Sequence, residues 1–442
     1  MKTATIVGAG LVGSLLAIYL RKRGHEVDLY ESRPDLREVD ISAGKSINLA
    51  LSNRGWRPLS EVGLEQDLEQ MIIPMRGRMI HDPEGNLSFQ PYGKEGQSIN
   101  SISRGGLNGL LMTRAEELGV HIHFSHKCLG VEFSSSTLLL RHQNKSIKVK
   151  SDFIFGTDGA FSAVRAGMQK TDRFNYSQHF IPHGYKELSF PAVGQNDFAI
   201  EKHALHIWPR GSYMLIALPN LDGSFTVTLF LPFEGENSFE RLQNEDNLKA
   251  FFEQHFKDAI ALMPNLWEEF KANPPASLVT VKCYPWVNQQ TVILGDAAHA
   301  IVPFYGQGMN AGFEDCYVLN KLLDEYEEDW SRALASFEKT RKPDTDAIAD
   351  LALQNFVEMR DKVGDPQFLT RKKIEAKLHE QFPGQWIPQY SMVTFNEDIR
   401  YSEALAQGLT QDAIMDVIMA QPNVELIWGD LNLQEIINQL DH

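Results

Sequence analysis

Residues 3–31 read TATIVGAGLVGSLLAIYLRKRGHEVDLYE, and this stretch decides the fold. The apolar run at residues 3–7 predicts a buried strand, and the glycines between residues 8 and 13 have the spacing G-x-G-x-x-G. A predicted helix follows as far as about Arg23, and residues 26–30 predict the next strand. The stretch therefore predicts a strand–helix–strand unit with a glycine-rich turn after its first strand.

The glycines and one acidic residue of this unit indicate a dinucleotide. Gly8 allows the tight turn, Gly10 lets the backbone approach a pyrophosphate, and Gly13 lets the helix pack on the strand. The helix start adds free N–H groups and a positive dipole end. Glu31, eighteen residues after Gly13, ends the second strand, where a carboxylate binds ribose hydroxyls and repels a 2′-phosphate. The expected nucleotide is FAD or NAD rather than NADP.

Three later motifs favour FAD over NAD. Asp158 and Asp296 each lie just after an apolar strand, where a ribitol hydroxyl can donate a hydrogen bond to the carboxylate. Residues 306–310 then begin a helix whose N–H groups favour the anion that reduced flavin forms. Because NAD has neither a ribitol chain nor that anion, the three motifs together predict a flavoprotein.

Length, composition and charge bound the class of protein. The 442 residues suggest about three domains, or two interleaved ones with an extension. The net charge of −16 argues against a surface for nucleic acid or an anionic membrane, since both require clustered lysine and arginine. The three widely spaced cysteines form no disulfide framework, which is typical of a reducing compartment. The uncharged run at residues 3–20 leads directly into another strand, so we expect no signal peptide and a soluble, cytoplasmic protein.

The predicted secondary structure of the rest of the chain changes along its length. Residues 176–281 are rich in strand patterns, and residues 330–441 are mainly helical. The predicted fold class is α/β, with a Rossmann-like FAD-binding domain interleaved with a β-sheet substrate domain and followed by a helical C-terminal region that closes the site. The predicted bounds are 1–70, 99–175 and 285–345 for the FAD-binding domain, 71–98 and 176–284 for the substrate domain, and 346–442 for the C-terminal region.

Local patterns predict individual elements. A hairpin pairs residues 75–81 with 87–89, and Arg76 and Arg78 on its first strand are predicted to face the same side. Helices are also predicted at 56–62, 64–71, 106–118, 239–256 and 308–326, and strands at 120–124, 130–133, 137–142, 146–150, 152–155, 183–190, 204–208, 213–218, 224–231 and 291–294.

These motifs resemble those of the class A flavoprotein monooxygenases, which share the p-hydroxybenzoate hydroxylase fold. Four longer runs are similar to the kynurenine 3-monooxygenase family in particular: SINLALS at 46–52, PHGY at 182–185, HIWPR at 206–210 and residues 295–316. The likeness extends from residue 3 to about residue 401. Eukaryotic members of that family carry a hydrophobic C-terminal membrane anchor, whereas this chain reaches His442 without one, so we expect no membrane anchor.

The resemblance implies an activity and its reactants. The family hydroxylates the anilino ring of L-kynurenine at C3, giving 3-hydroxykynurenine in tryptophan catabolism (the kynurenine pathway), with NADPH, O₂ and FAD. The oxygen comes from a flavin C4a-hydroperoxide, so no side chain is expected to act as a catalytic nucleophile. FAD is expected to be held tightly without a covalent link. NADPH is expected to dock transiently, because the chain has a single G-x-G-x-x-G. The protein is expected to be a monomer or a homodimer.

The resemblance also implies which residues bind the substrate. Arg78 matches the arginine that binds the substrate carboxylate, where a guanidinium fits the two oxygens in a fork. Tyr92 matches a tyrosine that assists it, and Asn355 and Tyr390 match polar residues that close the site from the C-terminal region. Without the resemblance, Arg78 reads as a surface strand residue and Tyr92 as an aromatic residue in a turn.

For the flavin, the resemblance adds contacts to those of the motifs. Arg104 is expected to neutralise the pyrophosphate, and Cys128 or its neighbour Leu129 to contact the adenine through its backbone. His299 is expected to be packed or hydrogen-bonded, and the histidines at 121, 123 and 126 are not expected to bind a metal. The full set of predicted cofactor residues is Gly8, Gly10, Val12, Gly13, Tyr30, Glu31, Ser32, Arg33, Ala50, Arg104, Cys128, Asp158, Asp296, Met309 and Asn310.

Two alternative functions stay open at this point. The first is a flavoprotein of the same fold that hydroxylates another aromatic or isoprenoid substrate, which a site without the pair Arg78 and Tyr92 favours. The second is a flavin-binding sensor without turnover, which predicts no NADPH oxidation that depends on a substrate.

Overall fold

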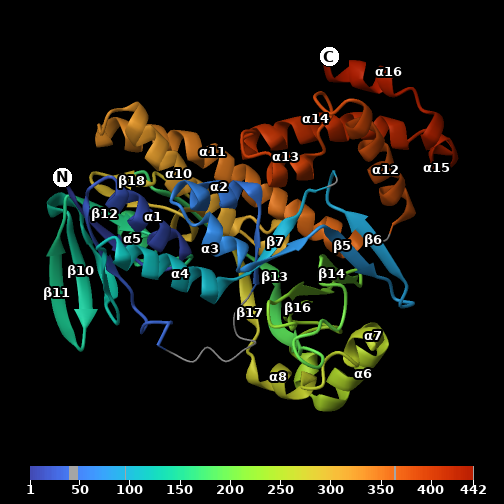
Figure 1. The fold of residues 1–442 in the computed structure, drawn as a ribbon, viewed down its shortest axis with the longest axis horizontal. Helices are drawn as coiled ribbons and strands as arrows, with labels where there is room; N and C mark the ends of the chain where they lie inside the picture. Colours follow the sequence, from blue (N-terminus) through green and yellow to red (C-terminus); the bar gives the residue numbers. More distant parts are fainter. Residues whose placement is uncertain (39–47, 95, 363–364, 442) are drawn as a thin grey trace.

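The computed structural model describes residues 1–38, 48–94, 96–362 and 365–441. Figure 1 shows strands and helices around the N-terminus at the left, a second sheet with long strands near the centre, and a group of helices around the C-terminus at the upper right. The mixture of parallel strand–helix units and an antiparallel sheet confirms the predicted α/β class.

The first sheet has six strands, in the order β18 (Val287–Asn288), β19 (Thr291–Ile293), β12 (Phe153–Gly156), β1 (Thr3–Val7), β2 (Glu26–Tyr30) and β8 (His121–His123). Strand β1 pairs in parallel with β2 and β12, and β12 with β19. Val7 lies opposite both Tyr30 and Gly156, and Gly156 lies opposite Ile293. This register brings the carboxyl ends of β1, β2, β12 and β19 to one edge of the sheet. The glycine turn, Glu31, Asp158 and Asp296 follow these ends and therefore lie at the same edge.

Helices enclose this sheet. Helix α1 (Leu11–Lys22) packs against α4 (Arg104–Glu117) and α10 (Gly308–Glu325). Residues 13–20 of α1 are all buried, because this helix lies between the sheet and the other two helices. A three-stranded antiparallel sheet adds Leu138 and Leu140 to the same core; its order is β11 (Lys145–Lys150), β10 (Thr137–His142) and β9 (Lys127–Glu132).

The largest sheet has seven strands, in the order β17 (Ala276–Tyr284), β13 (Asn175–Phe190), β16 (Phe225–Pro232), β15 (Met214–Pro219), β14 (Ala204–Pro209), β5 (Gly77–His81) and β6 (Leu87–Pro91). Successive side chains of each strand point to opposite faces of this sheet, so the two faces carry alternate residues. In β16, Val227 and Leu229 pack into a core with the helices α6 (Glu245–His255), α7 (Lys257–Ile260) and α8 (Leu266–Ala272). Thr228 and Phe230 of the same strand line a cavity on the opposite face.

The C-terminal region is helical, as predicted. A 28-residue helix, α11 (Trp330–Val357), continues into a π-helical turn at Glu358–Lys362. The helices that follow are α12 (Pro366–Gln381), α13 (Gln389–Phe395), α14 (Tyr401–Met419), α15 (Val424–Ile427) and α16 (Leu433–Ile437). Ile374, Trp386 and Met415 form a separate small core there. Within the described residues, no helix combines the length and the apolar composition needed to cross a membrane.

A second three-stranded sheet was not predicted. It joins β3 (Asn48–Leu51), β7 (Ile99–Ser103) and β4 (Ile72–Met75), short strands in which polar residues of β3 and β7 and the proline of β4 weaken the strand pattern. Strand β17 was also missed, and β13 begins at Asn175 rather than at His183. The helix predicted over 239–256 is regular only in α6. Ser46 and Ile47 of the SINLALS run lie outside the described residues.

One prediction about side-chain direction was wrong. Arg76 and Arg78 do not share a strand, because β4 ends at Met75 in the small sheet and β5 begins at Gly77 in the large one. Arg76 lies where the chain passes between the sheets, and its side chain is exposed, whereas Arg78 is buried. The predicted domain bounds stay a prediction, although the large sheet does combine β5 and β6 with strands from residues 175–284.

Candidate active site

One cavity of about 810 Å³ connects the parallel sheet with the seven-stranded sheet. At one end it is lined by Gly8, Tyr30 and Glu31, at the carboxyl edge of the parallel sheet. At the other end it is lined by Arg78 of β5, Tyr92 and Tyr390 of α13. This volume lies within the range of roughly 300–1,000 Å³ that is usual for ligand and cofactor sites.

The glycine turn has the close backbone contacts that its spacing predicts. A Cβ added at Gly13 would lie 2.0 Å from the carbonyl oxygen of Gly8, so only glycine fits there. Gly8 itself has a φ of +101°, which disfavours any other residue. Gly10 has nothing within 4 Å of an added Cβ, so the cavity above it is open for a ligand to approach the backbone.

Glu31 ends β2 with its carboxylate directed back to this turn. Its Oε2 accepts a hydrogen bond from the backbone N–H of Ala9 at 3.0 Å, and its Oε1 accepts from the backbone N–H and the Nε of Arg33, both at 2.9 Å. Burial raises the pKa of Glu31, but the hydrogen bonds from Arg33 and Ala9 outweigh burial and hold the pKa below its ordinary value. The carboxylate is therefore an ionised acceptor beside the turn.

The two aspartates predicted for the ribitol chain have different surroundings. Asp158 caps α5 (Ala163–Met168): its Oδ2 accepts from the backbone N–H of Ala163 at 2.7 Å, and its Oδ1 accepts from the hydroxyl of Ser162 at 2.5 Å. Asp296 begins α9 (Asp296–His299), and its exposed side chain lines the cavity. Of the two carboxylates, that of Asp296 is open to a ligand.

The first turn of α10 forms another part of the wall. Gly308 and Met309 line the cavity, and the first N–H groups of a helix have no acceptor within it. Asn310 has a different position: its Nδ2 donates to the carbonyls of Ala50 at 2.9 Å and Gly306 at 2.7 Å. Its side chain therefore ties β3 to the loop before α10 and does not line the cavity.

The other predicted cofactor residues surround the same end. Burial raises the pKa of the Cys128 thiol to about 12, so this group stays protonated and unreactive. Gly13 lies behind the cavity wall. The remaining predicted residues that line the cavity are Gly10, Val12, Ser32, Arg33, Ala50, Arg104, Cys128 and Asp158.

Arg78 is a buried cation at the opposite end. Arg78 is 9% exposed, and its guanidinium lies 4.9 Å from the ring centre of Tyr390 and 5.7 Å from that of Tyr92. Burial lowers the pKa of Arg78, but the nearby tyrosines and Glu358 outweigh burial and raise it. Its Nε is buried without a hydrogen-bond partner in the described part of the chain. A permanent cation with a free donor in this position is suited to an anion.

Three tyrosines stack beside this cation. The ring centres of Tyr92 and Tyr390 are 5.6 Å apart and those of Tyr390 and Tyr305 are 5.2 Å apart, with nearly parallel planes in both pairs. Burial raises the pKa of all three hydroxyls, so they remain neutral hydrogen-bond donors. Tyr305 was not singled out from the sequence, since it follows Pro303 and Phe304 in what reads as an ordinary apolar turn.

Glu358 is a second residue that sequence reasoning missed. It begins the π-helical turn after α11, and its Oε1 lies 3.8 Å from Nη1 of Arg78. Asn355, one turn earlier, was predicted to close the site, but it lies behind the wall, where its Nδ2 donates to the carbonyl of Phe304 at 2.6 Å. The π turn brings Glu358 to Arg78 and places Met359 on the cavity wall, and no sequence pattern signals such a turn.

Comparisons with known proteins agree with this geometry. Residues 1–352 match the family model described as FAD binding domain. Kynurenine 3-monooxygenase of Flavobacterium johnsoniae is 49% identical over 438 residues, which cover 98% of this chain and 97% of that protein. The pig enzyme of the same name (Sus scrofa) is 45% identical over 419 residues, which cover 94% of this chain and 88% of that protein.

The chain belongs to the kynurenine 3-monooxygenase family. It is therefore an FAD-dependent aromatic monooxygenase. A solved structure of 2-methyl-3-hydroxypyridine-5-carboxylic acid oxygenase, 22% identical, superposes with a TM-score of 0.67 and covers 84% of this chain and 95% of that one. This likeness supports the fold.

The residues present fit the FAD of the kynurenine 3-monooxygenase family. The open space above Gly10, the ionised Glu31 and the exposed Asp296 line one cavity, where they fit the pyrophosphate, the ribose and the ribitol chain of FAD, respectively. The first turn of α10 reaches the same cavity near the tyrosine end. The predictions of FAD and of a monooxygenase are thereby confirmed.

A buried ionic network lies behind the flavin end. Nε2 of His299 lies 2.5 Å from Oδ2 of Asp315, and Arg341 donates to Oδ1 of the same carboxylate at 2.8 Å. His299 is thus the hydrogen-bonded histidine that was predicted. The Oδ2 of Asp315 also accepts from the N–H of Gly295 at 3.0 Å, so the network holds the turn that presents Asp296.

Proposed function

We propose that this chain hydroxylates L-kynurenine at C3 of its anilino ring. The balanced reaction is L-kynurenine, NADPH, a proton and O₂ giving 3-hydroxykynurenine, NADP⁺ and water. The names of the curated relatives support this proposal. The structural observation that carries it is the pair formed by buried Arg78 and half-buried Glu358, which matches the carboxylate and the ammonium of an α-amino acid.

The amino-acid group of the substrate is assigned to the end of the cavity with the tyrosines. The unpaired Nε of Arg78 is a donor for the carboxylate, and the hydroxyls of Tyr92 and Tyr390 are neutral donors beside it. Oε1 of Glu358, 3.8 Å from the guanidinium, is the acceptor for the ammonium. Opposite charges held in fixed places select a zwitterion over a simple aromatic acid.

The aromatic ring of the substrate is assigned to the apolar part of the same end. Ile216, Phe230 and Phe304 line the cavity there, and Met359 adds a flexible wall. These side chains exclude water from the reacting carbon and keep the ring in one plane. The ring lies between the bound amino-acid group and the first turn of α10, which is where the chemistry has to occur.

The cofactor is assigned to the other end. Bound FAD, reduced by NADPH, supplies the activation of O₂. We assign the pyrophosphate to the turn at Gly10 and to Arg104, the ribose to Glu31, and the ribitol chain to Asp296. Val12, Tyr30, Ser32, Arg33, Ala50, Cys128 and Met309 complete the lining, while Asp158 and Asn310 hold the elements that carry it.

NADPH is proposed to dock transiently at the surface near the cavity. The sequence has one G-x-G-x-x-G, and FAD is assigned to it. We also propose that the enzyme acts in the cytoplasm, which the three free, buried cysteines support. Whether it works as a monomer or a homodimer stays an open prediction.

The test is NADPH oxidation by the FAD-loaded protein with and without L-kynurenine, with the product identified by mass and by chromatography against 3-hydroxykynurenine. We expect L-kynurenine to accelerate the oxidation. We also expect one product whose mass exceeds that of L-kynurenine by one oxygen atom, about 16 mass units. Oxidation that is indifferent to L-kynurenine but responds to another aromatic compound would assign the site to a different substrate. Oxidation that responds to none would leave a flavin-binding protein without turnover.

A further inference from the structure

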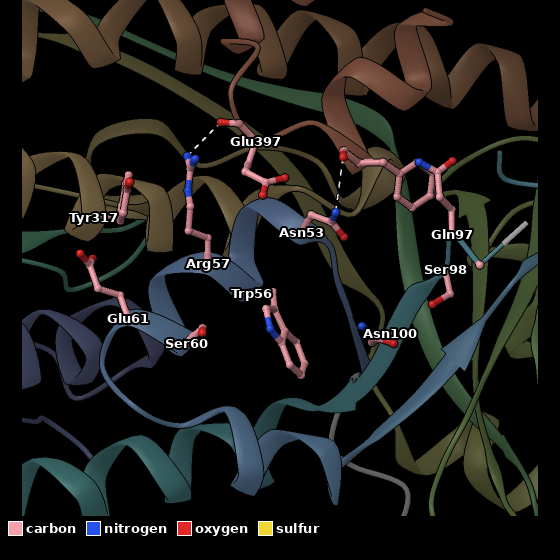
Figure 2. Close-up of a pocket in the computed structure, with 12 residues that line it drawn as sticks. Asn53, Trp56, Arg57, Ser60, Glu61, Gln97, Ser98, Asn100, Tyr317 and Glu397 are labelled. Carbon is pink, nitrogen blue, oxygen red and sulfur yellow. Dashed lines mark hydrogen bonds between the residues drawn. The ribbon is translucent and has the colours of Figure 1, made fainter. Parts of the chain in front are cut away.

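Three polar side chains of α2 (Asn53–Glu61) hold the end of α13. The dashed lines in Figure 2 mark two of their bonds: Nδ2 of Asn53 donates to the carbonyl of Phe395 at 3.3 Å, and Nη2 of Arg57 donates to the carbonyl of Glu397 at 2.9 Å. Nη1 of Arg57 also pairs with Asp398 at 3.0 Å. These bonds lie along a groove of about 660 Å³ on the solvent side of α2.

The third side chain, Arg54, lies behind the groove and is 1% exposed. Its Nε donates to the carbonyl of Val393 at 3.4 Å, and its Nη2 donates to the carbonyls of Asn396 at 3.0 Å and Ile399 at 2.7 Å. A guanidinium can satisfy several acceptors in fixed directions at once, which an ammonium cannot. We call Asn53, Arg54 and Arg57, with the carbonyls they bind, the α2–α13 clamp.

The clamp matters because α13 is too short to hold its own position. It has seven residues, and isolated helices of that length are not stable in water. Its last carbonyls have no partner within the helix and carry the negative end of its dipole, so cations are favoured there. Tyr390 is the second residue of α13, so the clamp fixes the helix that brings this tyrosine against Arg78 and Tyr92.

Arg54 also contacts α10. Its Nη1 pairs with Oε1 of Glu314 at 2.6 Å, on the helix α10 whose first turn lines the cavity. Its guanidinium lies 4.1 Å from the ring centre of Tyr401, whose hydroxyl donates to Gln307 Oε1 at 2.9 Å, directly before α10. One buried side chain thus touches the element that presents Tyr390 and the element that presents Met309.

We propose that Arg54 is a positioning residue that sets the substrate, through Tyr390, against the start of α10, and so determines how much of the NADPH consumed yields hydroxylated product. The inference rests on the proposed function. If Tyr390 moves away from Arg78, the ring is held less firmly and O₂ is reduced without transfer, giving NADP⁺ and H₂O₂ from NADPH, a proton and O₂. The expected signature is therefore a loss of coupling rather than a loss of cofactor.

The experiment uses the FAD-loaded enzyme and three variants. Arg54→Lys keeps the buried charge beside Glu314 but cannot serve three carbonyls; Arg57→Gln removes the half-exposed arm of the clamp and is the milder change. The matched control is Arg371→Gln, because Arg371 joins α12 to Asp412 and Asp416 of α14 in the same region but does not touch α13. Product per NADPH, H₂O₂, the KM for L-kynurenine, FAD content and Tm are measured for each.

For Arg54→Lys we expect KM to rise about tenfold, as for the loss of one strong hydrogen bond, with most of the NADPH diverted to H₂O₂ and the FAD content unchanged. Arg57→Gln is expected to shift the same two quantities less. Arg371→Gln is expected to lower Tm alone. A merely structural role would lower Tm and leave product per NADPH and KM unchanged, and that result for Arg54→Lys and Arg57→Gln overturns the inference. If Arg54→Lys does not fold, Arg57→Gln decides.

Failure of the inference is distinct from failure of the proposed function. If the unaltered enzyme shows no oxidation that depends on L-kynurenine, the proposed function is wrong. If the unaltered enzyme couples NADPH to product and both clamp variants couple equally well, only the role of Arg54 is wrong.

Discussion

The two ends of the cavity are built in opposite ways. At the flavin end, the glycine turn and Glu31 come from one continuous stretch, residues 3–31, and hydrogen bonds within that stretch fix their geometry. At the substrate end, Arg78, Tyr92, Glu358 and Tyr390 come from β5, the segment after β6, a π turn and a short helix, separated by up to 312 positions. Local sequence specifies the first end, and tertiary packing specifies the second.

This difference predicts where substitutions act. At the flavin end, the local backbone determines the geometry of the site. Substitutions there are therefore of two kinds: those that disturb the glycine turn and those that block the ligand. Residues at the substrate end depend on elements that are distant in sequence, so the effect of a substitution there reports how well these elements are held together. The following tests are arranged from the largest expected effect to the smallest.

The largest effect is expected for Gly13→Ala, compared with Gly10→Ala. A Cβ at Gly13 would lie 2.0 Å from the carbonyl oxygen of Gly8, so the turn must move, at a cost of about 3 kcal/mol or more in stability. A Cβ at Gly10 meets nothing within 4 Å, so the stability of the FAD-free protein should not change.

Thermal unfolding of the FAD-free proteins and FAD titration check this pair. Gly10→Ala is expected to keep the Tm but to bind FAD weakly, because its methyl group enters the space above the turn. If Gly10→Ala binds FAD as tightly as the unaltered chain, the pyrophosphate does not approach this backbone.

The next largest effect is expected for Arg78→Ala at the substrate end. The carboxylate of L-kynurenine loses a charge-assisted donor, which weakens substrate binding by about 2–4 kcal/mol, or roughly 30- to 1,000-fold, while FAD binding is retained. Arg78→Lys should recover only part of this, since an ammonium does not match the two oxygens. Equilibrium titration of the FAD-loaded enzyme with L-kynurenine measures both.

Two controls isolate the pairing. Arg76→Ala removes the neighbouring exposed arginine and should leave the affinity for L-kynurenine unchanged. The decarboxylated analogue should bind the unaltered enzyme poorly and should be almost insensitive to Arg78→Ala. An equal loss for the substrate and the analogue would make Arg78 a structural residue.

The same contrast explains what could be predicted from the sequence. Residues 3–31 specify strand, turn and helix through local rules, so the G-x-G-x-x-G and Glu31 were placed correctly from spacing alone. Arg76 and Arg78 were placed wrongly on one strand, because a change of sheet at Arg76 depends on distant partners, Asn100 and His203, that local periodicity does not report. Tyr92 and Tyr390 were found only by resemblance, and Glu358 was not found, since the π turn that brings it to Arg78 has no sequence signal.

A third test compares the two aspartates of the flavin end. Asp296→Ala is expected to weaken FAD retention by about 1–3 kcal/mol and to leave the Tm of the FAD-free protein unchanged, because the carboxylate is exposed. Asp158→Ala is expected to do the reverse: it removes the acceptor for the N–H of Ala163 at the start of α5, while the N-cap residue Ser162 stays, and it lowers stability by about 1 kcal/mol. Loss of FAD on dialysis and thermal melts separate the two. Equal FAD loss from both variants would give Asp158 a ligand contact as well.

The smallest effect concerns pH and belongs to the substrate half alone. Burial lowers the pKa of His206 to about 4. This histidine belongs to a chain of hydrogen bonds: its Nδ1 lies 2.9 Å from Nε2 of His81, and Nδ1 of His81 lies 3.1 Å from Oδ2 of Asp258. Its Nε2 lies 2.7 Å from the carbonyl of Glu201, which can only accept, so His206 is neutral with its proton on Nε2.

The sign of the effect follows from the lowered pKa. The unfolded chain takes up this proton near the ordinary pKa of about 6.5 and the folded chain only near 4, so the stability is complete above pH 6.5 and falls as the pH drops towards 4. By pH 5.5 the loss is on the order of 1 kcal/mol. His206→Gln should remove this part of the pH dependence, whereas His203→Gln, at the residue just before β14, should retain it. Thermal melts at pH 7.5 and 5.5 measure the difference, and a slope that His206→Gln leaves unchanged would show that the acid sensitivity arises at other groups.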